Sequence, residues 1–289
     1  PVVMGQRPDP AARQRALDEG GGSELTEAAV LRALIWLKDN QETDGSWSPK
    51  QYTEAMTGLA LLTFLAHGET LESPEYGPTV LKGTRWLVNH MLAKPRLTAK
   101  GYSHAIATYA LAEADCLMDL PILRPALDLG LSRIVAGQQE AGGFDYNYAK
   151  GERWDLSVTA WQIQALKTGQ LAGSQVPGVA EALEQARQFV ATTTYKDGRF
   201  GYSSPGSGSW GMQGAGILSL QMLGHGKSRP IKAATENLAR DFRPVWDDQS
   251  KHQAHSHPSY AWYYCTQALF HSGKRAFSGW NRQFAPMLI

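Results

Sequence analysis

The stretch Ala33-Leu-Ile-Trp-Leu-Lys-Asp-Asn-Gln-Glu-Thr-Asp-Gly-Ser-Trp47 decides how this chain folds. Apolar residues recur every three or four positions in its first half, which predicts an amphipathic helix. That helix is expected to end near Gln41, because the following Thr-Asp-Gly45 is turn chemistry and glycine adopts positive φ without steric cost. Trp47 then brings a large apolar ring back toward the helix, and the Gln41 amide is placed to bond free backbone groups at the helix end.

A two-helix unit of about 50 residues repeats along the chain. Each unit has an amphipathic helix, a Gly-aromatic turn and a more apolar second helix. The second helices align at Thr57, Thr108 and Thr159, each 51 residues after the one before, and further copies begin near Gly214 and Tyr260. A period of this length with two helices per unit is typical of a solenoid or a closed ring.

The turns recur less regularly than the helices. Gln139-Glu-Ala-Gly-Gly143-Phe144 repeats the Gln, the Gly and the aromatic residue of the first copy, and Tyr195-Lys-Asp-Gly198-Arg-Phe200 keeps the last two. The second unit has Met91 in place of Gln, and the fifth has a polar loop instead of a Gly turn. Three recognisable turns and five registered helix pairs together predict a repeat protein.

The composition of the helices predicts two layers. The second helices, such as 56–66, are apolar nearly all round and must be buried on every side, which places them in an inner layer. The amphipathic first helices form the outer layer. Residues 1–23 are interpreted as a linker that contains a short helix, and residues 24–289 as a single domain that ends in a further half-unit.

The pattern Ala33-x-x-Trp36-Leu37-x-x-x-Gln41-x-x-x-Gly45-x-Trp47 resembles the QW repeat of the squalene and hopene cyclases and related prenyltransferase-fold proteins. This resemblance covers residues 26–275 and implies an all-α fold. It implies a single α-α toroid, in which an outer ring of helices surrounds an inner ring, with about five helix pairs plus end pieces.

At a finer level the chain is similar to bacterial proteins that are known only as carriers of prenyltransferase and squalene oxidase repeats. The similar segments are Ser103–Leu111, Asp155–Lys167 and Trp280-Asn281. Those proteins imply no established activity.

Composition bounds the function. The net charge of +1, from 28 basic and 27 acidic residues, favours no polyanionic partner, so nucleic acid binding is not expected.

Cys116 and Cys265 lie in apolar helical stretches and are interpreted as two free buried thiols, which leaves the compartment open. No run reaches the ~20 apolar residues of a membrane span. The chain begins at Pro1 without Met, so we expect a longer protein in which membrane association comes only from parts outside this chain.

The register brings one pair of polar residues to the same level of consecutive inner helices. His104 and Asp155 occupy equivalent helix starts, about one interhelical spacing of 8–10 Å apart. A carboxylic acid that shares its proton with an imidazole is a candidate general acid. The alternative is that Asp155 simply caps its helix, as Asp commonly does.

The family resemblance also shows what is missing. The Asp-x-Asp-Asp-like acid motif of the cyclases is absent, and Asp247-Asp248 lies in a polar loop. The zinc ligands of prenyltransferases are Asp, Cys and His, whereas here His252-x-x-His255-x-His257 stands in a loop with Cys265 as the nearest thiol. No metal or other cofactor is therefore expected, and His252, His255 and His257 are only weak candidates.

The central cavity is expected to be aromatic. Rings that line a cavity hold an apolar ligand or stabilise a carbocation. The candidate cavity residues are Glu54, Tyr109, Trp161, Trp210, Tyr260, Trp262 and Tyr263.

Three functions remain open. The first is a terpene-cyclase-like domain that binds an isoprenoid or other apolar small molecule, with catalysis unproven. The second is a non-catalytic binding or scaffold module on the same ring. The third is a carbohydrate-active toroid enzyme, which needs separated carboxylates such as Glu54 and Asp155. Nothing in the sequence indicates the oligomeric state.

Overall fold

A computed structural model describes residues 7–48, 50–93, 100–244 and 258–289 of the chain. Helices provide almost all of the regular structure in these residues, which confirms the predicted all-α class. The single hairpin pairs β1 (Tyr195–Lys196) with β2 (Arg199–Phe200) in antiparallel register. The helices are α2 (Pro10–Gly20), α3 (Glu24–Asp39), α4 (Thr53–His67), α5 (Gly77–Ala93), α6 (Gly101–Met118), α7 (Leu123–Gly137), α8 (Leu156–Leu171), α9 (Val179–Gln188), α10 (Trp210–Met222), α11 (Arg229–Asp241), α12 (Pro258–His271) and α13 (Lys274–Phe284), with short π and 3-10 turns at Phe189–Thr193 and Ala285–Met287.

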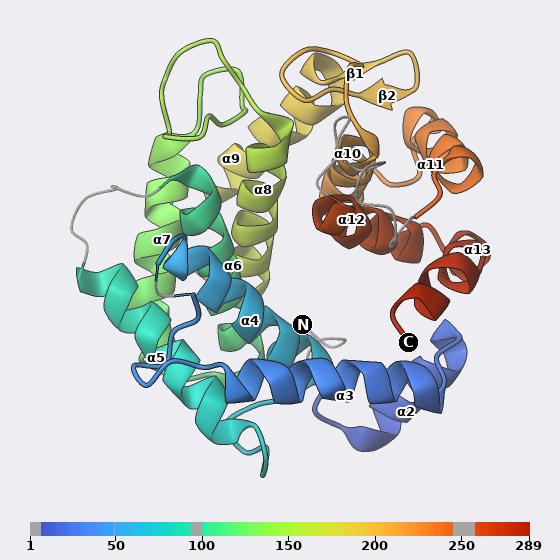
Figure 1. Cartoon of the computed structure of the whole chain (residues 1–289). Helices are drawn as coiled ribbons and strands as arrows, with labels where there is room; N and C mark the ends of the chain where they lie inside the picture. Colours follow the sequence, from blue (N-terminus) through green and yellow to red (C-terminus); the bar gives the residue numbers. More distant parts are fainter. Residues whose placement is uncertain (1–6, 49, 94–99, 245–257) are drawn as a thin grey trace.

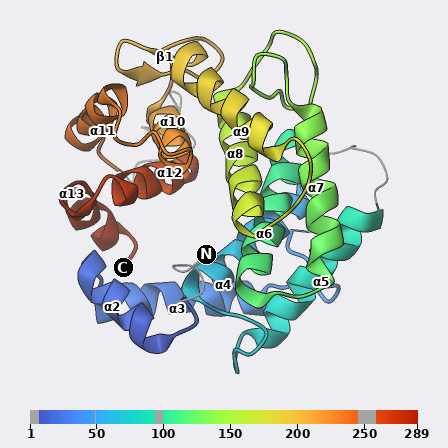
Figure 2. The same cartoon turned by 180° about the vertical axis from the view of Figure 1, so that it is seen from behind.

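The helices alternate between two layers along the chain. Helices α4, α6, α8, α10 and α12 pack against one another in chain order on the inner side, and α3, α5, α7, α9, α11 and α13 lie outside them (Figures 1 and 2). Helix α13 packs against α2, so the first and the last of the described helices lie together.

The inner helices α6, α8 and α10 are buried on nearly every face, as their composition predicts, whereas α4 and α12 leave residues such as Met56 and Phe270 exposed. In α8 every residue from Leu156 to Leu166 is buried, and in α10 every residue from Gly211 to Leu220. Burial of apolar surface at roughly 25 cal/mol per Å² provides the main stabilisation of such helices. The outer helices bury only one stripe each, for example Ile231, Ala234 and Leu238 in α11.

The first turn ties three segments together. Trp47 is 4% exposed, and its indole N–H donates to the Leu37 carbonyl at 2.8 Å. The Gln41 amide donates to the carbonyls of Gly45 and of Thr79 in α5, each at 3.0 Å. Gly45 has a φ of 97° and lies against the backbone of α5, where a Cβ would meet the Lys82 carbonyl oxygen at 2.5 Å. Only glycine meets both conditions.

The third unit repeats this turn and corrects its predicted register. Gln138, and not Gln139, donates to the carbonyls of Gly142 and of Ala182 in α9, each at 2.9 Å. Gln139 instead donates to the Ala149 and Arg153 carbonyls of the following loop. Gln41 lies six residues before Trp47, and Gln138 lies six residues before Phe144, so the spacing from Gln to the aromatic residue selects the first Gln of the pair.

The aromatic residues of the first and third turns are anchored in the same way. The backbone N–H of Trp47 donates to the Thr57 hydroxyl at 3.0 Å, and that of Phe144 donates to the Thr159 hydroxyl at 3.1 Å. These threonines are the residues on which the sequence repeats align. In the fourth unit the N–H of Phe200 donates to the side chain of Gln213 in α10 instead.

Residues 7–23 contain the short helix that the sequence predicts in the N-terminal segment, and they contact the inner helices. Helix α2 is capped by Asp9, whose carboxylate accepts from the Ala11 N–H. Arg7 forms an ion pair of 2.7 Å with Glu113 of α6, and Arg13 donates to the His67 carbonyl at the end of α4. The segment is held because it supplies cations to acceptors on two inner helices.

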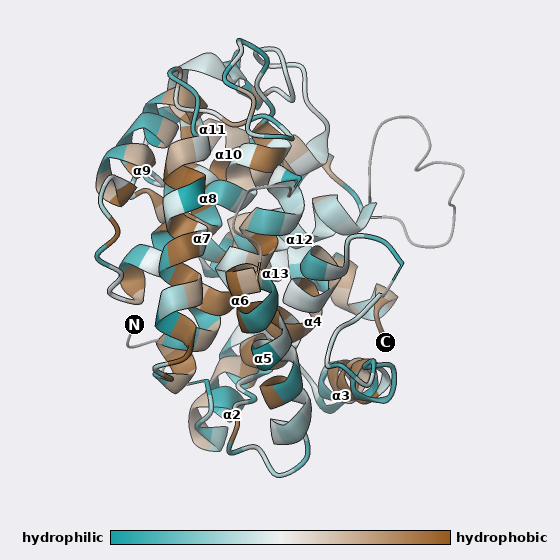
Figure 3. Cartoon of the chain, turned by 90° about the vertical axis from the view of Figure 1, so that its left-hand side faces the viewer, coloured by the Kyte–Doolittle hydropathy of each residue, from teal (hydrophilic) through white to brown (hydrophobic). Residues whose placement is uncertain are grey.

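Helix α3 is the least covered of the outer helices. Leu34 is its only fully buried residue, whereas Val30, Leu31, Ile35 and Trp36 are exposed. Figure 3, which views α3 nearly along its axis, shows the hydrophobic colour on this helix. Among the described residues, no helix is both long and apolar enough to cross a membrane.

Candidate functional site

A pocket of about 1250 Å³ opens where the five inner helices begin. Each of these helices contributes a lining residue from its first turns, as the register of the repeats predicts: Met56 from α4, Ser103 from α6, Ser157 from α8, Met212 from α10 and Tyr260 from α12.

The lining combines an apolar surface, phenols and two cations. Ala55, Met56, Ile106 and Met212 supply apolar contacts. Five tyrosines, two cationic side chains and several hydroxyl groups complete the wall, and none of the lining residues carries a carboxylate; the tyrosines and cations are Tyr52, Tyr102, Tyr146, Tyr202, Tyr260, Lys100 and Arg199.

The tyrosines are held in place by hydrogen bonds. Tyr146 and Tyr202 share one between their hydroxyl groups, and the Tyr260 hydroxyl donates to the Ser157 carbonyl at 3.2 Å. Tyr102 is bonded to the Ser157 hydroxyl. Burial raises the pKa of both Tyr102 and Tyr202, so these side chains are neutral phenols at physiological pH.

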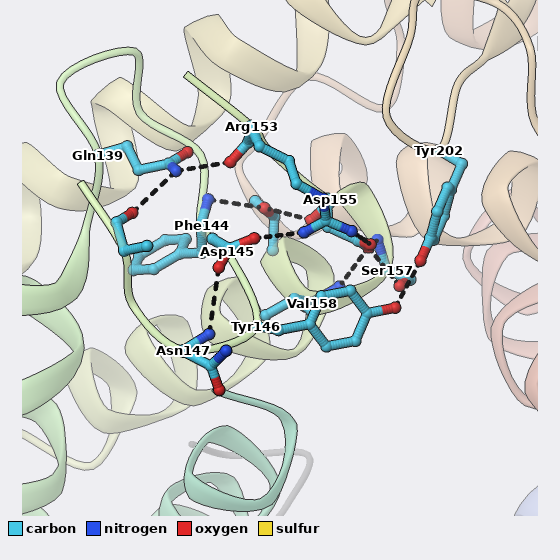
Figure 4. Close-up of polar contacts among 12 residues, drawn as sticks. Gln139, Phe144, Asp145, Tyr146, Asn147, Arg153, Asp155, Ser157, Val158 and Tyr202 are labelled. Carbon is cyan, nitrogen blue, oxygen red and sulfur yellow. Dashed lines mark hydrogen bonds and ion pairs between the residues drawn. The ribbon is translucent and has the colours of Figure 1, made fainter. Parts of the chain in front are cut away.

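Asp155 lies fully buried behind this wall and caps α8 (Figure 4). Its Oδ1 accepts from the N–H groups of Ser157 at 2.8 Å and Val158 at 3.2 Å. Its Oδ2 lies 3.8 Å from the Arg153 guanidinium and has no hydrogen bond among the described residues. The alternative that Asp155 is a helix cap is therefore confirmed.

A chain of hydrogen bonds nevertheless links Asp155 to the pocket. The Ser157 hydroxyl is bonded both to Asp155 Oδ1 and to the Tyr102 hydroxyl. Because the single hydroxyl hydrogen of Ser157 is donated to Asp155, the Ser157 oxygen accepts from Tyr102. Tyr102 is thus the end of this chain that faces the pocket.

His104 lies elsewhere, and the predicted pairing with Asp155 is wrong. Its Nε2 is 3.0 Å from the Gly130 carbonyl of the outer helix α7, and its ring lies edge-on to Tyr148. The side chain is 2% exposed, and burial lowers its pKa to about 4. The imidazole is therefore neutral at pH 7, and Nε2 donates to the Gly130 carbonyl. Register fixes a residue's level along a helix, but not the direction in which its side chain points.

Glu54 also points away from the predicted cavity. Its carboxylate pairs with His90 of the outer helix α5, and His90 stacks on Trp86. Glu54 is not among the residues that line the pocket. With Asp155 in a cap, neither carboxylate proposed for a carbohydrate-active site faces this pocket.

Three of the predicted cavity aromatics lie together between α6, α8 and α12. Trp161 stacks on Tyr263 with a ring separation of 4.9 Å and lies 6.4 Å from Tyr109. The Tyr109 hydroxyl donates to Glu113 at 2.9 Å, and the Tyr263 hydroxyl donates to the Gln164 amide oxygen at 3.0 Å. These rings pack on one another, and Tyr260 is the only predicted aromatic that lines the described pocket.

Trp210 and Trp262 face outward, which corrects their placement in the cavity. The Trp210 ring packs 5.7 Å from Phe242, which follows α11, and the Trp262 ring packs 5.8 Å from Phe284 of α13. An inner helix presents apolar side chains on both of its sides, so composition does not distinguish the two directions.

The described residues contain no group of three or more His, Cys, Asp or Glu side chains that could hold a metal ion. His252, His255, His257 and Asp247-Asp248 lie outside the described residues. Cys116 and Cys265 are free thiols on α6 and α12; Cys265 is buried, as predicted, whereas Cys116 is only half-buried.

The sequence did carry a signal for two lining residues that prediction missed. Tyr146 follows Phe144 by two residues, and Tyr202 follows Phe200 by two, so each aromatic turn is continued by a tyrosine. Phe144 and Phe200 are buried in the core, whereas the tyrosine two residues after each of them lines the pocket.

No protein-family model matches the chain, and no curated protein is similar enough in sequence to count as a match.

Proposed function

We propose that this chain is an α-α toroid of the QW-repeat type that binds an amphipathic, isoprenoid-like small molecule in the pocket at the starts of its inner helices. The repeated turns support the architecture. Gln41 and Gln138 each bond the next outer helix, and α13 packs on α2 at the junction of the chain ends.

The observation that carries the ligand proposal is the lining of the pocket. Ala55, Met56, Ile106 and Met212 provide an apolar wall for a hydrocarbon body. Small-molecule sites are typically apolar clefts of about 300–1,000 Å³ with a few polar groups that fix orientation. At about 1250 Å³ the pocket accommodates a ligand of isoprenoid size.

The polar end of the ligand is assigned to the two cations of the lining, Lys100 and Arg199. Lys100 lies 4.7 Å from the Tyr52 ring and Arg199 lies 5.6 Å from the Trp210 ring, so each cation is held over an aromatic face. Together with neutral phenols that donate hydrogen bonds, these cations favour a hydroxyl or anionic head group over a cationic one.

Binding without catalysis is the form of this proposal that the contacts favour. The predicted acid pair is not formed, because His104 bonds α7 and Asp155 caps α8. One observation favours a second candidate, a proton-transfer enzyme on the same pocket. It is the hydrogen-bonded chain from Tyr102 through Ser157 to Asp155.

A ligand panel tests the binding proposal. Farnesol, geranylgeraniol, squalene and farnesyl diphosphate are titrated and the melting temperature is followed, since a ligand selective for the folded state stabilises it by about 2.7 kcal/mol at 100 times its Kd. Met56→Trp places a large ring at a 43% exposed lining position and should weaken binding at least tenfold. Leu92→Trp, at a 46% exposed position outside the pocket, is the matched control.

Unchanged melting with every compound at saturating concentration would leave the non-catalytic scaffold as the better interpretation. Equal weakening by Met56→Trp and Leu92→Trp would also count against this pocket.

A further inference from the structure

A second hollow of about 1290 Å³ lies on the outer layer, between α11 and α13. It is bounded by the loop after α10 and by the end of α12. Figure 1 shows α11 and α13 as neighbours in the last part of the chain. This second hollow is called the α11/α13 groove below.

The bottom of the groove is apolar and recessed. Leu269 is 0% exposed and Trp280 is 4% exposed, and the Phe242 ring stacks on Trp280 at 5.5 Å. The side chains above them are small. A Cβ added at Gly279, which lines the groove, would meet no heavy atom within 4 Å. The groove therefore has an apolar bottom with free space above it.

The rim of the groove is positively charged. Lys227, Lys232 and Arg275 line it and are exposed, whereas Glu236 is the only carboxylate among the lining residues. Arg240 also lines the groove, but its guanidinium is bonded to Asp241 at 2.7 and 2.8 Å. The three other cations thus set the sign of the local potential.

We propose that the α11/α13 groove binds a free amphipathic anion, a single molecule with a phosphate or carboxylate head and an alkyl body. The head pairs with Lys232 and Arg275, and the alkyl body lies over Leu269 and Trp280. The recessed bottom favours a free molecule over a bilayer, because a flat membrane reaches protruding side chains and not a surface below two helices.

Decyl phosphate, kept below its aggregation concentration, is the probe, and its binding is measured by calorimetry. Lys232→Glu and Arg275→Glu should each weaken it at least fivefold. Gly279→Phe should abolish binding, because its ring occupies the free space. Arg229→Glu and Lys274→Glu change neighbouring cations that do not line the groove and should leave the affinity within twofold. Decanol, which lacks the charge, should bind at least tenfold more weakly.

Several results would overturn the proposal. These are the absence of saturable binding to the wild type, or equal weakening by the control variants. Loss of binding in Met56→Trp but not in the groove variants would assign decyl phosphate to the inner pocket. Binding to phosphatidylglycerol vesicles without binding of decyl phosphate would assign the groove to a membrane surface. Circular dichroism melts verify folding, and the two charge variants decide the matter if Gly279→Phe does not fold.

Discussion

Gln41 and Gln138 make the same two hydrogen bonds in turns that lie 97 residues apart. Each amide donates to the glycine carbonyl of its own turn and to a carbonyl in the first turns of the next outer helix. The end of α3 is thus fixed to α5, and the end of α7 to α9. One side chain thus fixes the position of the turn and ties it to the next outer helix.

Removal of this side chain should cost stability. Gln138 is 8% exposed, so Gln138→Ala leaves the Gly142 and Ala182 carbonyls without their donor in a buried place. We expect a loss of about 1–3 kcal/mol in the free energy of unfolding, measured in urea. Gln175→Ala removes an exposed amide that bonds only a carbonyl two residues away, and should cost less than about 0.5 kcal/mol. If Gln138→Ala also lost less than about 0.5 kcal/mol, the turn would be held by packing alone.

The two tryptophans of the first repeat should contribute very differently to the stability of the protein. Trp47 is 4% exposed and Trp36 is 62% exposed. Trp47→Ala deletes a buried ring and its bond to the Leu37 carbonyl, and is expected to cost about 3–5 kcal/mol. Trp36→Ala should change stability by less than about 0.5 kcal/mol. Denaturant melts of both variants decide this, and similar losses would show that the exposed ring is covered in solution.

The repeat itself made much of the fold predictable. Alignment on Thr57 and Thr159 identified inner helices because both residues carry the same hydrogen bond to a turn. The wrong glutamine was chosen in the third turn because Gln138-Gln139 and Gly142-Gly143 are both doublets. The first copy resolves these doublets, because its glutamine lies six residues before its aromatic residue and only Gln138 lies six residues before Phe144.

The direction of side chains was not predictable in the same way. His104 and Trp210 stand on helices that are buried on nearly all sides, and Trp262 stands on the mainly apolar helix α12. Such helices lack the polar face that reveals orientation. His104 bonds a carbonyl of α7 and both tryptophans pack outward. These contacts depend on rotation about the helix axis, which tertiary packing sets.

His104 should make stability fall in mild acid. Burial lowers its pKa to about 4, from about 6.5 in the unfolded chain. The unfolded state therefore binds more protons between these two pH values. The contribution of His104 to the stability of the folded protein is complete above pH 6.5 and is lost progressively as the pH falls toward 4. His104→Gln keeps a donor for the Gly130 carbonyl but does not titrate. The difference in unfolding free energy between wild type and variant should shrink by up to about 3 kcal/mol from pH 7 to pH 4. A difference that stays constant with pH would contradict burial of the neutral imidazole.

The two thiols should be free but unreactive in the folded protein. Burial raises the pKa of Cys116 to about 11 and raises that of Cys265 as well, so little thiolate is present at pH 8. Titration with a disulfide reagent should find two thiols in denaturant without reductant. The native protein should react much more slowly, and Cys265, which is fully buried, should react last. Finding no thiol in the denatured protein would show that the two are oxidised.

Variants of Asp155 distinguish the proposal that the pocket only binds a ligand from the proposal that it is a catalytic site. Its Oδ1 accepts two backbone N–H groups of α8, and its side chain is fully buried behind Ser157. Asn caps a helix about as well as Asp, so Asp155→Asn should fold normally and bind the pocket ligand within twofold of wild type. Asp155→Ala removes the acceptor and should cost about 1–2 kcal/mol of stability.

The same variants test the hydrogen-bonded chain from the pocket to this carboxylate. Tyr102→Phe breaks it at the end that faces the ligand, whereas Asp155→Asn keeps the acceptor oxygen at the buried end but removes the carboxylate that could exchange a proton. If the pocket only binds, both variants keep ligand affinity and neither affects the fate of a polyprenyl substrate in product analysis. The catalytic alternative predicts that the wild type converts such a substrate and that both variants lose conversion while they keep affinity and stability. That result would show that the hydrogen bonds from Tyr102 to Asp155 transfer a proton. The cap would then have a chemical role as well as a structural one.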